Sequence, residues 1–252
     1  MNNGTLPPST PEQELAKRTR RGFLGLGLGA AAAAGGWQWL WSQPQEGGIP
    51  VPLRSVLDAN ARLNQNLLFR DAHLAPEFPP ERIQAIRANG DFGLEGALDA
   101  DAWRLALTPL RGAAPLQLTM ADLKKLNKLE YTAEFKCIEG WSSIVRWGGV
   151  RFRDFVSLYA PGAEKAAYVS LTTPDKEYFV GVDMASMLHP QTMLCFEQNG
   201  QPLELAHGAP LRLVIPVKYG IKNIKRIGTI SFSDQAPPDY WAEEGYDYYA
   251  GL

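Results

Sequence analysis

The chain has 252 residues, of which 45% are hydrophobic and 21% are charged, and its formal net charge is −2. This composition is typical of a globular protein with one large domain or two small ones. The charge argues against a nucleic-acid-binding protein, whose surface carries an excess of basic residues. The two cysteines, Cys137 and Cys195, cannot form a disulfide framework, and they lie too far apart for a Cys-x-x-Cys zinc or haem motif.

Residues 1–41 have the pattern of an export segment. Arg20 and Arg21 stand one residue before Phe23, where an apolar run begins that reaches about Trp41. Paired arginines ahead of such a run are the twin-arginine export address, which a receptor reads. The run is close to the roughly 20 apolar residues that a membrane-spanning helix needs. We therefore expect a periplasmic protein whose twin-arginine segment is either a cleaved signal or an anchor in the inner membrane; an ordinary signal with incidental arginines is the alternative.

The rest of the chain divides into a linker and one domain. Residues 42–60 are rich in proline, glycine and polar residues, as linkers are, and lead into a domain over residues 61–252. Within this domain, the prolines of residues 61–118 predict a mostly irregular segment. Its best strand is WRLAL, at residues 103–107.

A helix and a strand are predicted ahead of Cys137. Thr119 and Asp122 predict a helix start, because a threonine hydroxyl accepts hydrogen bonds from first-turn amides and an acid favours the positive helix end. We expect this helix to end near Glu130. Residues 131–137 then alternate between apolar and polar side chains, which is typical of a half-buried strand. This alternation places Cys137 on the inward face, where the strand ends in a glycine-containing loop.

Further short strands are predicted towards the C-terminus. Asn199-Gly200 predicts a tight hairpin turn, since both residues tolerate positive φ. Many short strands with few helices predict a β-rich α+β domain. The segments predicted as strands are residues 166–171, 177–184, 192–198 and 211–217.

Cys137 is the first candidate for chemistry. A buried cysteine most often packs as a small hydrophobic residue, and this reading suits Cys195, which lies mid-strand among large apolar neighbours. Cys137 differs, because strand ends that open into glycine-rich loops present side chains to ligands. It could act as a nucleophile with His189 or His207 as base, or bind a soft metal as a thiolate. The residues alone leave packing, nucleophile and metal ligand open.

Basic residues gather around Gly220. Such clusters are more often solvated surfaces, but this one is interleaved with apolar strand residues and follows His207, so part of it should face inward. A buried arginine with a lysine nearby needs an anion, and a phosphate satisfies both. The cluster therefore predicts a phosphorylated cofactor. Its members are Arg212, Lys218, Lys222, Lys225 and Arg226.

These pieces together resemble a known family. Residues 136–156, KCIEGWSSIVRWGGVRFRDFV, resemble the cysteine segment of the sulfite oxidase-like molybdopterin-dependent oxidoreductases. The opening CIEGWS is most similar to the catalytic subunits of periplasmic protein-methionine-sulfoxide reductases. Residues 189–227 are similar to the family's hairpin, its G-x-P-x-R-L strand and its lysine-rich segment, and residues 237–252 to its Trp- and Tyr-rich end. The likeness covers roughly residues 60–252.

The resemblance implies a sulfite oxidase-type fold that buries one molybdopterin with one molybdenum per chain. Cys137 falls on the thiolate that binds molybdenum, so it is the predicted catalytic residue and metal ligand. Thr173 beside Thr172 leaves the register of that match open by one residue. Leu67 and Leu68 match through their backbone. The positions that match cofactor-binding residues of the family are Asn64, Leu67, Leu68, Thr172, His207, Arg212, Asn223, Ile224 and Lys225.

The sequence departs from the closest subfamily in two places. His207 replaces an asparagine, and the histidine could also carry a proton near neutral pH. Leu67 and Leu68 replace a Tyr-Glu pair, which removes polar groups that could orient a substrate or tune the metal. The departures weaken the assignment of a substrate more than that of the cofactor.

The resemblance also implies an activity. We expect oxygen-atom transfer, in the direction that reduces a sulfoxide or similar oxide, either a small molecule or protein-bound, with electrons from a membrane haem b subunit. One alternative is a sulfite-oxidising dehydrogenase. Against it, only Arg146, Arg151 and Arg153 lie near Cys137 in the sequence, too few for an arginine-rich lining. A non-catalytic exported binding module is the other alternative.

Overall fold

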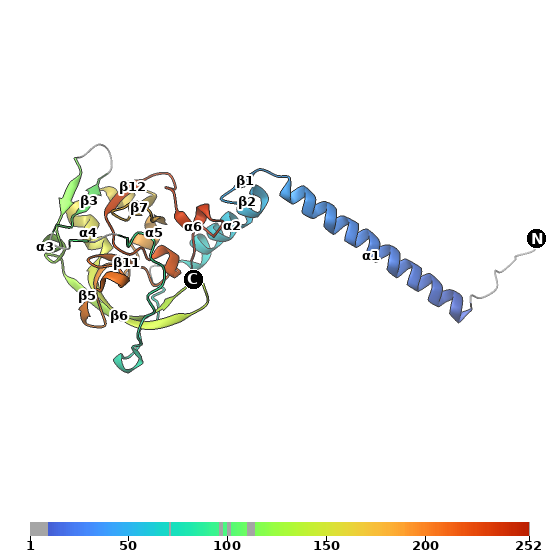
Figure 1. The fold of residues 1–252 in the computed structure, drawn as a ribbon, viewed down its shortest axis with the longest axis horizontal. Helices are drawn as coiled ribbons and strands as arrows, with labels where there is room; N and C mark the ends of the chain where they lie inside the picture. The colour runs from blue at the N-terminus through green and yellow to red at the C-terminus, as the bar shows by residue number, and fades with distance from the viewer. Residues whose placement is uncertain (1–9, 71, 96–97, 100–101, 110–113, 252) are drawn as a thin grey trace, which may run out of the picture. The chain divides into compact units, whose positions relative to one another are not determined.

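The computed structural model describes residues 10–70, 72–95, 98–99, 102–109 and 114–251. Its contacts divide the chain into two units, with the boundary between Arg54 and Ser55 (Figure 1). The first unit contains helix α1 (Pro11–Trp41) and the strand pair β1 (Gln45–Glu46) and β2 (Ile49–Pro50).

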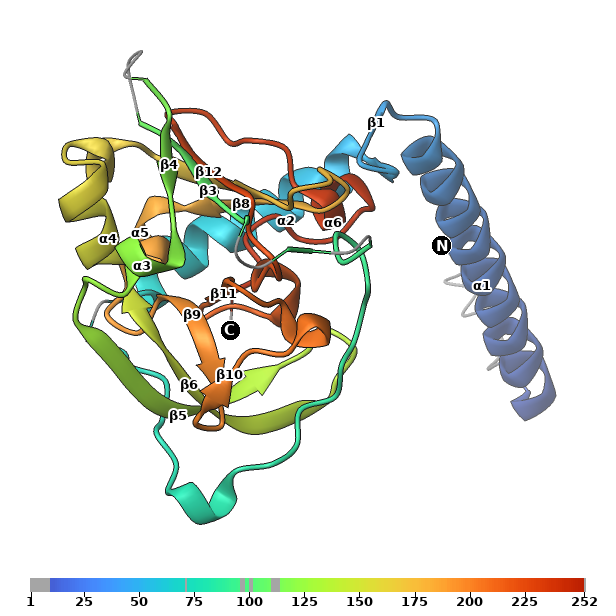
Figure 2. The same ribbon diagram turned by 60° about the vertical axis from the view of Figure 1, so that its left-hand side comes forward.

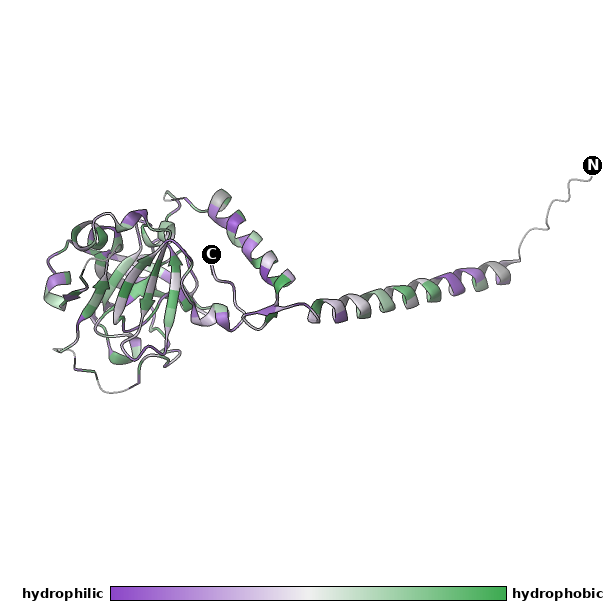
Figure 3. Cartoon of the chain, turned by 90° about the horizontal axis from the view of Figure 1, so that it is seen from above, coloured by the Kyte–Doolittle hydropathy of each residue, from purple (hydrophilic) through white to green (hydrophobic). Residues whose placement is uncertain are grey.

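Helix α1 carries the export pattern. Figure 3 shows polar residues towards its N-terminal end and apolar residues over the turns that follow. Large apolar side chains on it, Phe23 and Trp37 among them, are exposed. Within the described part of the chain, no helix has both the length and the apolar character required to cross a membrane.

Helix α2 (Val51–Leu63) begins inside the segment expected to be a linker. Pro52 lies in its first turn, where the missing N–H removes no helical hydrogen bond and the fixed φ suits a helix start. The proline that suggested a linker is thus compatible with a helix, and residues 42–60 are partly helical.

Two sheets organise the unit that begins at Ser55. The first has the strand order β10-β9-β6-β5, and β11 also pairs with β9; every pair in it is antiparallel. Its strands are β5 (Lys128–Lys136), β6 (Ser142–Arg151), β9 (Met193–Gln198), β10 (Gln201–Pro202) and β11 (Arg212–Val214).

The second sheet has a mixed pattern. Its order is β4-β3-β12-β7-β8, in which β12 and β3 are parallel and the other neighbours are antiparallel. In Figure 2 it lies above the first sheet. Its strands are β3 (Leu105–Thr108), β4 (Leu116–Leu118), β7 (Tyr168–Thr172), β8 (Phe179–Asp183) and β12 (Thr229–Ser233).

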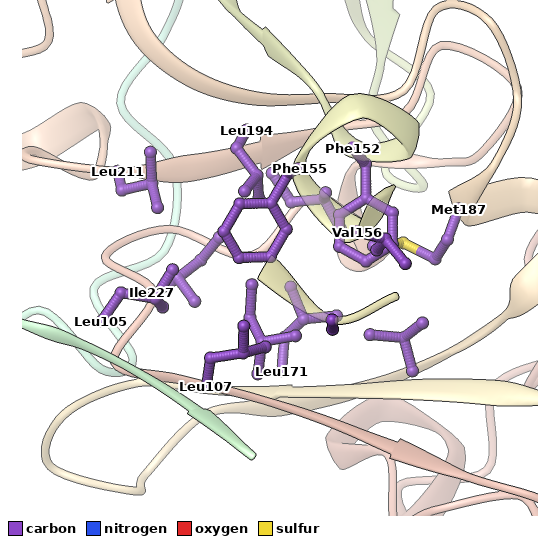
Figure 4. Close-up of a cluster of buried hydrophobic side chains, with 14 of the residues drawn as sticks. Leu105, Leu107, Phe152, Phe155, Val156, Leu171, Met187, Leu194, Leu211 and Ile227 are labelled. Atoms are coloured by element: carbon purple, nitrogen blue, oxygen red, sulfur yellow. The ribbon is translucent and has the colours of Figure 1, made fainter. Parts of the chain in front are cut away.

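The main core fills the space between the two sheets. Helix α4 (Phe152–Tyr159) points Phe155 between Leu194 of β9 and Leu107 and Leu171 of the second sheet, as Figure 4 shows. All four side chains are fully buried, and each such burial stabilises the fold by about 2 kcal/mol. The predicted β-rich α+β class is confirmed. The other short helices are α3 (Met120–Leu123), α5 (Met184–Met187) and α6 (Tyr240–Glu243).

The local predictions hold where a side-chain pattern is strong. Thr119 caps α3 and forms a reciprocal capping box with Asp122, as expected. Asn199 and Gly200 have φ values of 52° and 78° and form the hairpin turn between β9 and β10. The predicted strands occur as β3, β5, β7, β8, β9 and β11.

The predicted length of the helix after Thr119 is wrong. Helix α3 ends at Leu123, and β5 already begins at Lys128, which pairs with Val150 of β6. Residues 128–130 favour a helix by themselves, but the ladder to β6 outweighs this weak local preference. Strand β6 itself contains Gly148 and Gly149 and was not predicted. A Cβ on Gly149 would lie 2.2 Å from the carbonyl oxygen of Leu194, so glycine allows the close approach of β6 and β9.

Candidate active site

Cys137 lies where the fold turns from β5 into β6. The backbone N–H of Cys137 donates to the carbonyl of Trp141 at 2.9 Å. The carbonyl of Cys137 accepts a hydrogen bond from the N–H of Gly140 at 3.1 Å. Gly140 has a φ of 89°, which glycine adopts without strain. This tight loop leaves only 9% of Cys137 exposed, which confirms its predicted inward position at the strand end.

An open pocket has Cys137 in its wall. Its empty volume is about 870 Å³ when the part open to solvent is included. Five of the predicted site residues meet here, although Cys137 is distant in the sequence from the other four. They are Cys137, His207, Arg212, Asn223 and Lys225.

Arg212 is the buried cation of this pocket. It lies on β11, with its guanidinium over the ring of Trp147, 4.9 Å from the centroid, and 5.6 Å from that of Phe135. Its nitrogens donate to the carbonyl oxygens of His207 and Asn223 at 3.0 and 3.4 Å. Burial lowers the pKa of Arg212 to about 10, and its buried Nε has no partner within the described residues. Among the described residues, no carboxylate forms an ion pair with this buried positive charge.

Lys225 adds a second positive charge to this pocket, and His207 lies close enough to feel both cations. The ammonium of Lys225 donates to the carbonyl oxygens of Asn89 and Gly90 at 2.8 and 3.0 Å. Burial, and then the charge of Arg212, lowers the pKa of Lys225 to about 8. Burial also lowers the pKa of His207, and the charges of Arg212 and Lys225 lower it further. An anion bound among these groups would reverse all three shifts.

Asn223 and Ile224 support the pocket from behind. The side chain of Asn223 accepts from the N–H of Ile215 at 2.7 Å and donates to the carbonyl of Tyr219 at 3.0 Å. These bonds hold the 3₁₀ helix η5 (Gly220–Lys222), whose Gly220 and Ile221 line the pocket. Ile224 does not line it, since its side chain is buried in the main core.

The remaining predicted positions do not meet Cys137 in this pocket. Asn64 and Leu67 lie in the short π-helix η1 (Asn64–Leu68), where Leu67 is 61% exposed and Asn64 lies close to Gly251. The side chain of Leu68 falls outside the described part of the chain. Thr172 pairs in β7 with Thr229 of β12. The assignment of these residues to the cofactor stays a prediction.

Thr173, the alternative to Thr172, is fully buried and turned towards its own loop. Its hydroxyl donates to Asp175 at 2.6 Å and accepts from the N–H of Tyr178 at 3.1 Å. Tyr178 in turn lines the pocket and donates to the carbonyl of Ile221 at 2.6 Å. Thr173 therefore contributes to the pocket through Tyr178.

Two lysines of the basic cluster are balanced by aspartates inside the protein. Lys218 pairs with Asp183 at 2.9 Å, and Lys222 pairs with Asp239. Both lysines are almost fully buried, as is Arg226, which donates to the carbonyl of Leu94. The expectation that part of the cluster faces inward is confirmed. Arg212, Lys225 and Arg226 have no acidic partner within ion-pair distance among the described residues, and of these three Arg212 and Lys225 line the pocket.

The second cysteine and second candidate base are structural. Cys195 is fully buried mid-strand in β9, and burial raises its pKa to about 11. Packing, the reading favoured for it, is confirmed. His189 is also buried; its Nε2 lies 3.3 Å from the carbonyl of His73, and it is absent from the residues lining the pocket. It therefore cannot serve as a base for Cys137 in this arrangement.

Sequence reasoning missed a second wall of the pocket. Arg87 and Asn89 reach it from an irregular segment, where the turn dipeptide Asn89-Gly90 was the one local signal. The amide of Asn89 donates to Glu139 at 3.2 Å and lies 3.9 Å from the sulfur of Cys137. Aromatic residues complete this wall: Phe92, Tyr178, Trp241 and Tyr246.

Comparison with known proteins places the chain in a family. Residues 92–241 match the oxidoreductase molybdopterin binding domain, which is more than half of the chain. The chain belongs to this family. As a member, it is a molybdopterin-binding oxidoreductase, which sets aside the non-catalytic binding module.

Two relatives of this oxidoreductase carry related names. It is 33% identical over 205 residues to a putative protein-methionine-sulfoxide reductase subunit, YedZ1, of Azospira oryzae, covering 79% of this chain and 77% of the relative. It is 30% identical over 224 residues to the protein-methionine-sulfoxide reductase catalytic subunit MsrP of Campylobacter jejuni, covering 79% and 73%. The resemblance stated from the sequence is confirmed.

A solved structure shares the fold of the oxidoreductase. The sulfane dehydrogenase SoxCD from Paracoccus pantotrophus aligns with a TM-score of 0.50 at 21% identity, over 56% of this chain and 40% of that chain. At this identity the likeness bears on the fold alone. It agrees with the α+β, sulfite oxidase-type molybdopterin-binding fold.

The residues of the pocket fit a molybdenum cofactor. A cysteine thiolate is a soft metal ligand. The buried, unpartnered Nε of Arg212 and the lowered pKa values of Lys225 and His207 fit the phosphate of a pterin cofactor. Cys137 would hold the metal, and Arg212, Lys225 and His207 the phosphate end.

A pH-dependent anion response tests this reading of the pocket. Inorganic pyrophosphate should raise the thermal unfolding midpoint of the cofactor-free protein at about pH 7, because only the folded state binds it. The rise should shrink at about pH 9.5, since Lys225, with a pKa of about 8 in the folded protein, has then lost its proton.

The variants Lys225→Met and Lys125→Met supply the comparison. Lys125 pairs with Asp122 on the surface, so its loss should leave the response to pyrophosphate intact. Lys225→Met should weaken the response at about pH 7 and remove most of its pH dependence. An unchanged response in Lys225→Met would contradict the assignment of the anion to this pocket.

Proposed function

We propose that this oxidoreductase reduces a sulfoxide or similar oxide by oxygen-atom transfer, using one molybdenum cofactor per chain. The observation that carries the proposal is the meeting of the Cys137 thiol with Arg212, Lys225 and His207 in one pocket. When bound, the cofactor supplies the oxygen-atom transfer. The sulfoxide loses its oxygen as water and takes up two electrons and two protons, leaving a thioether.

In this proposal the chain's own residues bind the cofactor and orient the substrate. Cys137 ligates the metal, while Arg212 and Lys225 fix the phosphate end. At the mouth, Phe92 is 47% exposed and Tyr246 is 40% exposed, and Trp241 packs between them with ring centroids 6.4 and 5.1 Å away. Exposed aromatic rings beside a pocket favour a substrate with an apolar body, as an S-substituted sulfoxide has.

The electrons come from a separate membrane haem b subunit in this proposal. The names of the relatives support a partner, since one is named as a subunit and the other as a catalytic subunit.

A sulfite-oxidising dehydrogenase remains a second candidate because of Arg87. Arg87 lines the pocket together with Arg212, so two arginines from distant segments reach it. The arginines near Cys137 in the sequence do not line it, and Arg146 instead pairs with Glu130. A reduced-dye assay with methionine sulfoxide and other S- and N-oxides, beside a dye-reduction assay with sulfite, separates the two. Turnover of sulfite alone would favour the second candidate.

The role of Cys137 predicts a large and selective loss. Cys137→Ser should lower oxide reduction by at least about 100-fold, because even residues behind a metal ligand contribute about 10- to 100-fold. Its unfolding midpoint should stay near that of the native protein, since Cys137 borders the pocket. Molybdenum, pterin content and dye-linked turnover are measured on enzyme matured in its host.

Cys195→Ala is the matched control for Cys137→Ser. Cys195 is the other free cysteine, and it is buried outside the pocket, so its loss should lower stability and spare turnover. Full oxide reduction by Cys137→Ser would contradict the proposed function, as would native protein matured in its host without molybdenum.

We further propose that the chain is exported to the periplasm through the twin-arginine route and acts beside the inner membrane, where residues 1–41 remain as an anchor or are cleaved. Arg20 and Arg21 carry this proposal. Replacing both by lysine should leave the enzyme in the cytoplasmic fraction, while Arg18→Lys should not. Periplasmic enzyme from the double variant would contradict the route.

A further inference from the structure

We propose that Asn89 is a positioning residue for the sulfur of Cys137. This inference rests on the proposed function, since it concerns the sulfur that holds the metal. The side-chain nitrogen of Asn89 lies 3.9 Å from that sulfur, although the two residues are 48 positions apart in the sequence. The same nitrogen donates to Oε1 of Glu139 at 3.2 Å.

The orientation of the Asn89 amide is fixed by its partners. A carboxylate only accepts hydrogen bonds, so Glu139 selects the NH₂ end of the amide and leaves its second N–H for the sulfur. Glu139 is itself held by the indole N–H of Trp141, which donates to Oε2 at 3.1 Å. The amide therefore presents a donor to Cys137.

The backbone of Asn89 is held from the other side of the pocket. Lys225 donates to the carbonyl oxygens of both Asn89 and Gly90. Gly90 has a φ of 69°, which lets two successive carbonyls turn towards one ammonium. Lys225, which we assign to the phosphate, thus also holds Asn89 near Cys137. It connects the phosphate end of the proposed cofactor site with the metal end.

The state of the sulfur decides the strength of this contact. A neutral thiol is a weak acceptor, which agrees with a separation as long as 3.9 Å. A metal-bound thiolate carries negative charge and accepts strongly, so the contact should tighten once the sulfur is a ligand. A hydrogen bond to a thiolate ligand withdraws electron density from the sulfur and stabilises the reduced metal.

The test is a redox measurement on the holoenzyme. In Asn89→Leu, which keeps a similar volume without the donor, the reduction potential of molybdenum should shift to more negative values. The sulfur-to-molybdenum charge-transfer absorption should shift to longer wavelength, because the sulfur electrons are no longer stabilised. Asn127→Leu, at an exposed loop asparagine outside the pocket, should change neither property.

The possible results distinguish a failure of this inference from a failure of the proposed function. Native enzyme that lacks molybdenum overturns both. Asn89→Leu that holds native amounts of molybdenum with an unchanged potential and spectrum overturns the inference alone. If Asn89→Leu loses the cofactor, Asn89 serves to hold the cofactor. That result would also overturn the inference that Asn89 positions the sulfur. If Asn89→Leu does not fold, Asn89→Ala carries the same expectations and the same contrary results.

Discussion

A buried positive charge without an acid to balance it is the feature on which the site depends. Arg212 rests on Trp147 and Phe135, donates to two carbonyl oxygens and keeps a buried Nε without a described partner. Leaving an ion unpaired inside a protein costs several kcal/mol. A second cation, Lys225, lies in the same pocket wall, and an anion bound between the two would offset this cost.

The neighbouring lysines show that the imbalance is local. Lys218 and Lys222 are as deeply buried as Arg212, yet each has its own aspartate, Asp183 or Asp239. Their pairs join β8 and the C-terminal segment to the strands of the pocket. Lys218 and Lys222 therefore stabilise the fold, while Arg212 and Lys225 line the pocket, where they can bind a ligand. The division follows from which lysines meet an acid in space.

Features of the fold and the site that depend on contacts between residues close in the sequence could be predicted. Features that depend on contacts between distant segments could not. The inward position of Cys137, the Thr119 cap and the Asn199-Gly200 turn follow from contacts within a few residues, and the sequence pattern was sufficient for them. Helix α3 was predicted too long because its end is decided by the pairing of β5 with β6, which local propensity does not contain.

The missed wall of the pocket has the same cause. Asn89 and Arg87 lie in a segment without periodicity, and they become site residues only because Lys225 and Glu139 hold that segment from afar. The aromatic residues at the C-terminal end carried no pattern that distinguished the mouth of a pocket from a core. Family resemblance predicted Cys137 as the thiolate ligand and Arg212 and Lys225 as phosphate-binding residues, while the packing of the structure was needed to place Asn89 beside the sulfur.

The central claim is that the sulfur of Cys137 binds molybdenum in this pocket. X-ray absorption at the molybdenum edge tests it most directly, because it counts the sulfur atoms around the metal. The account predicts one sulfur fewer around molybdenum in Cys137→Ser than in the native enzyme, with the pterin sulfurs retained. An equal number of sulfur ligands in the two proteins would contradict it.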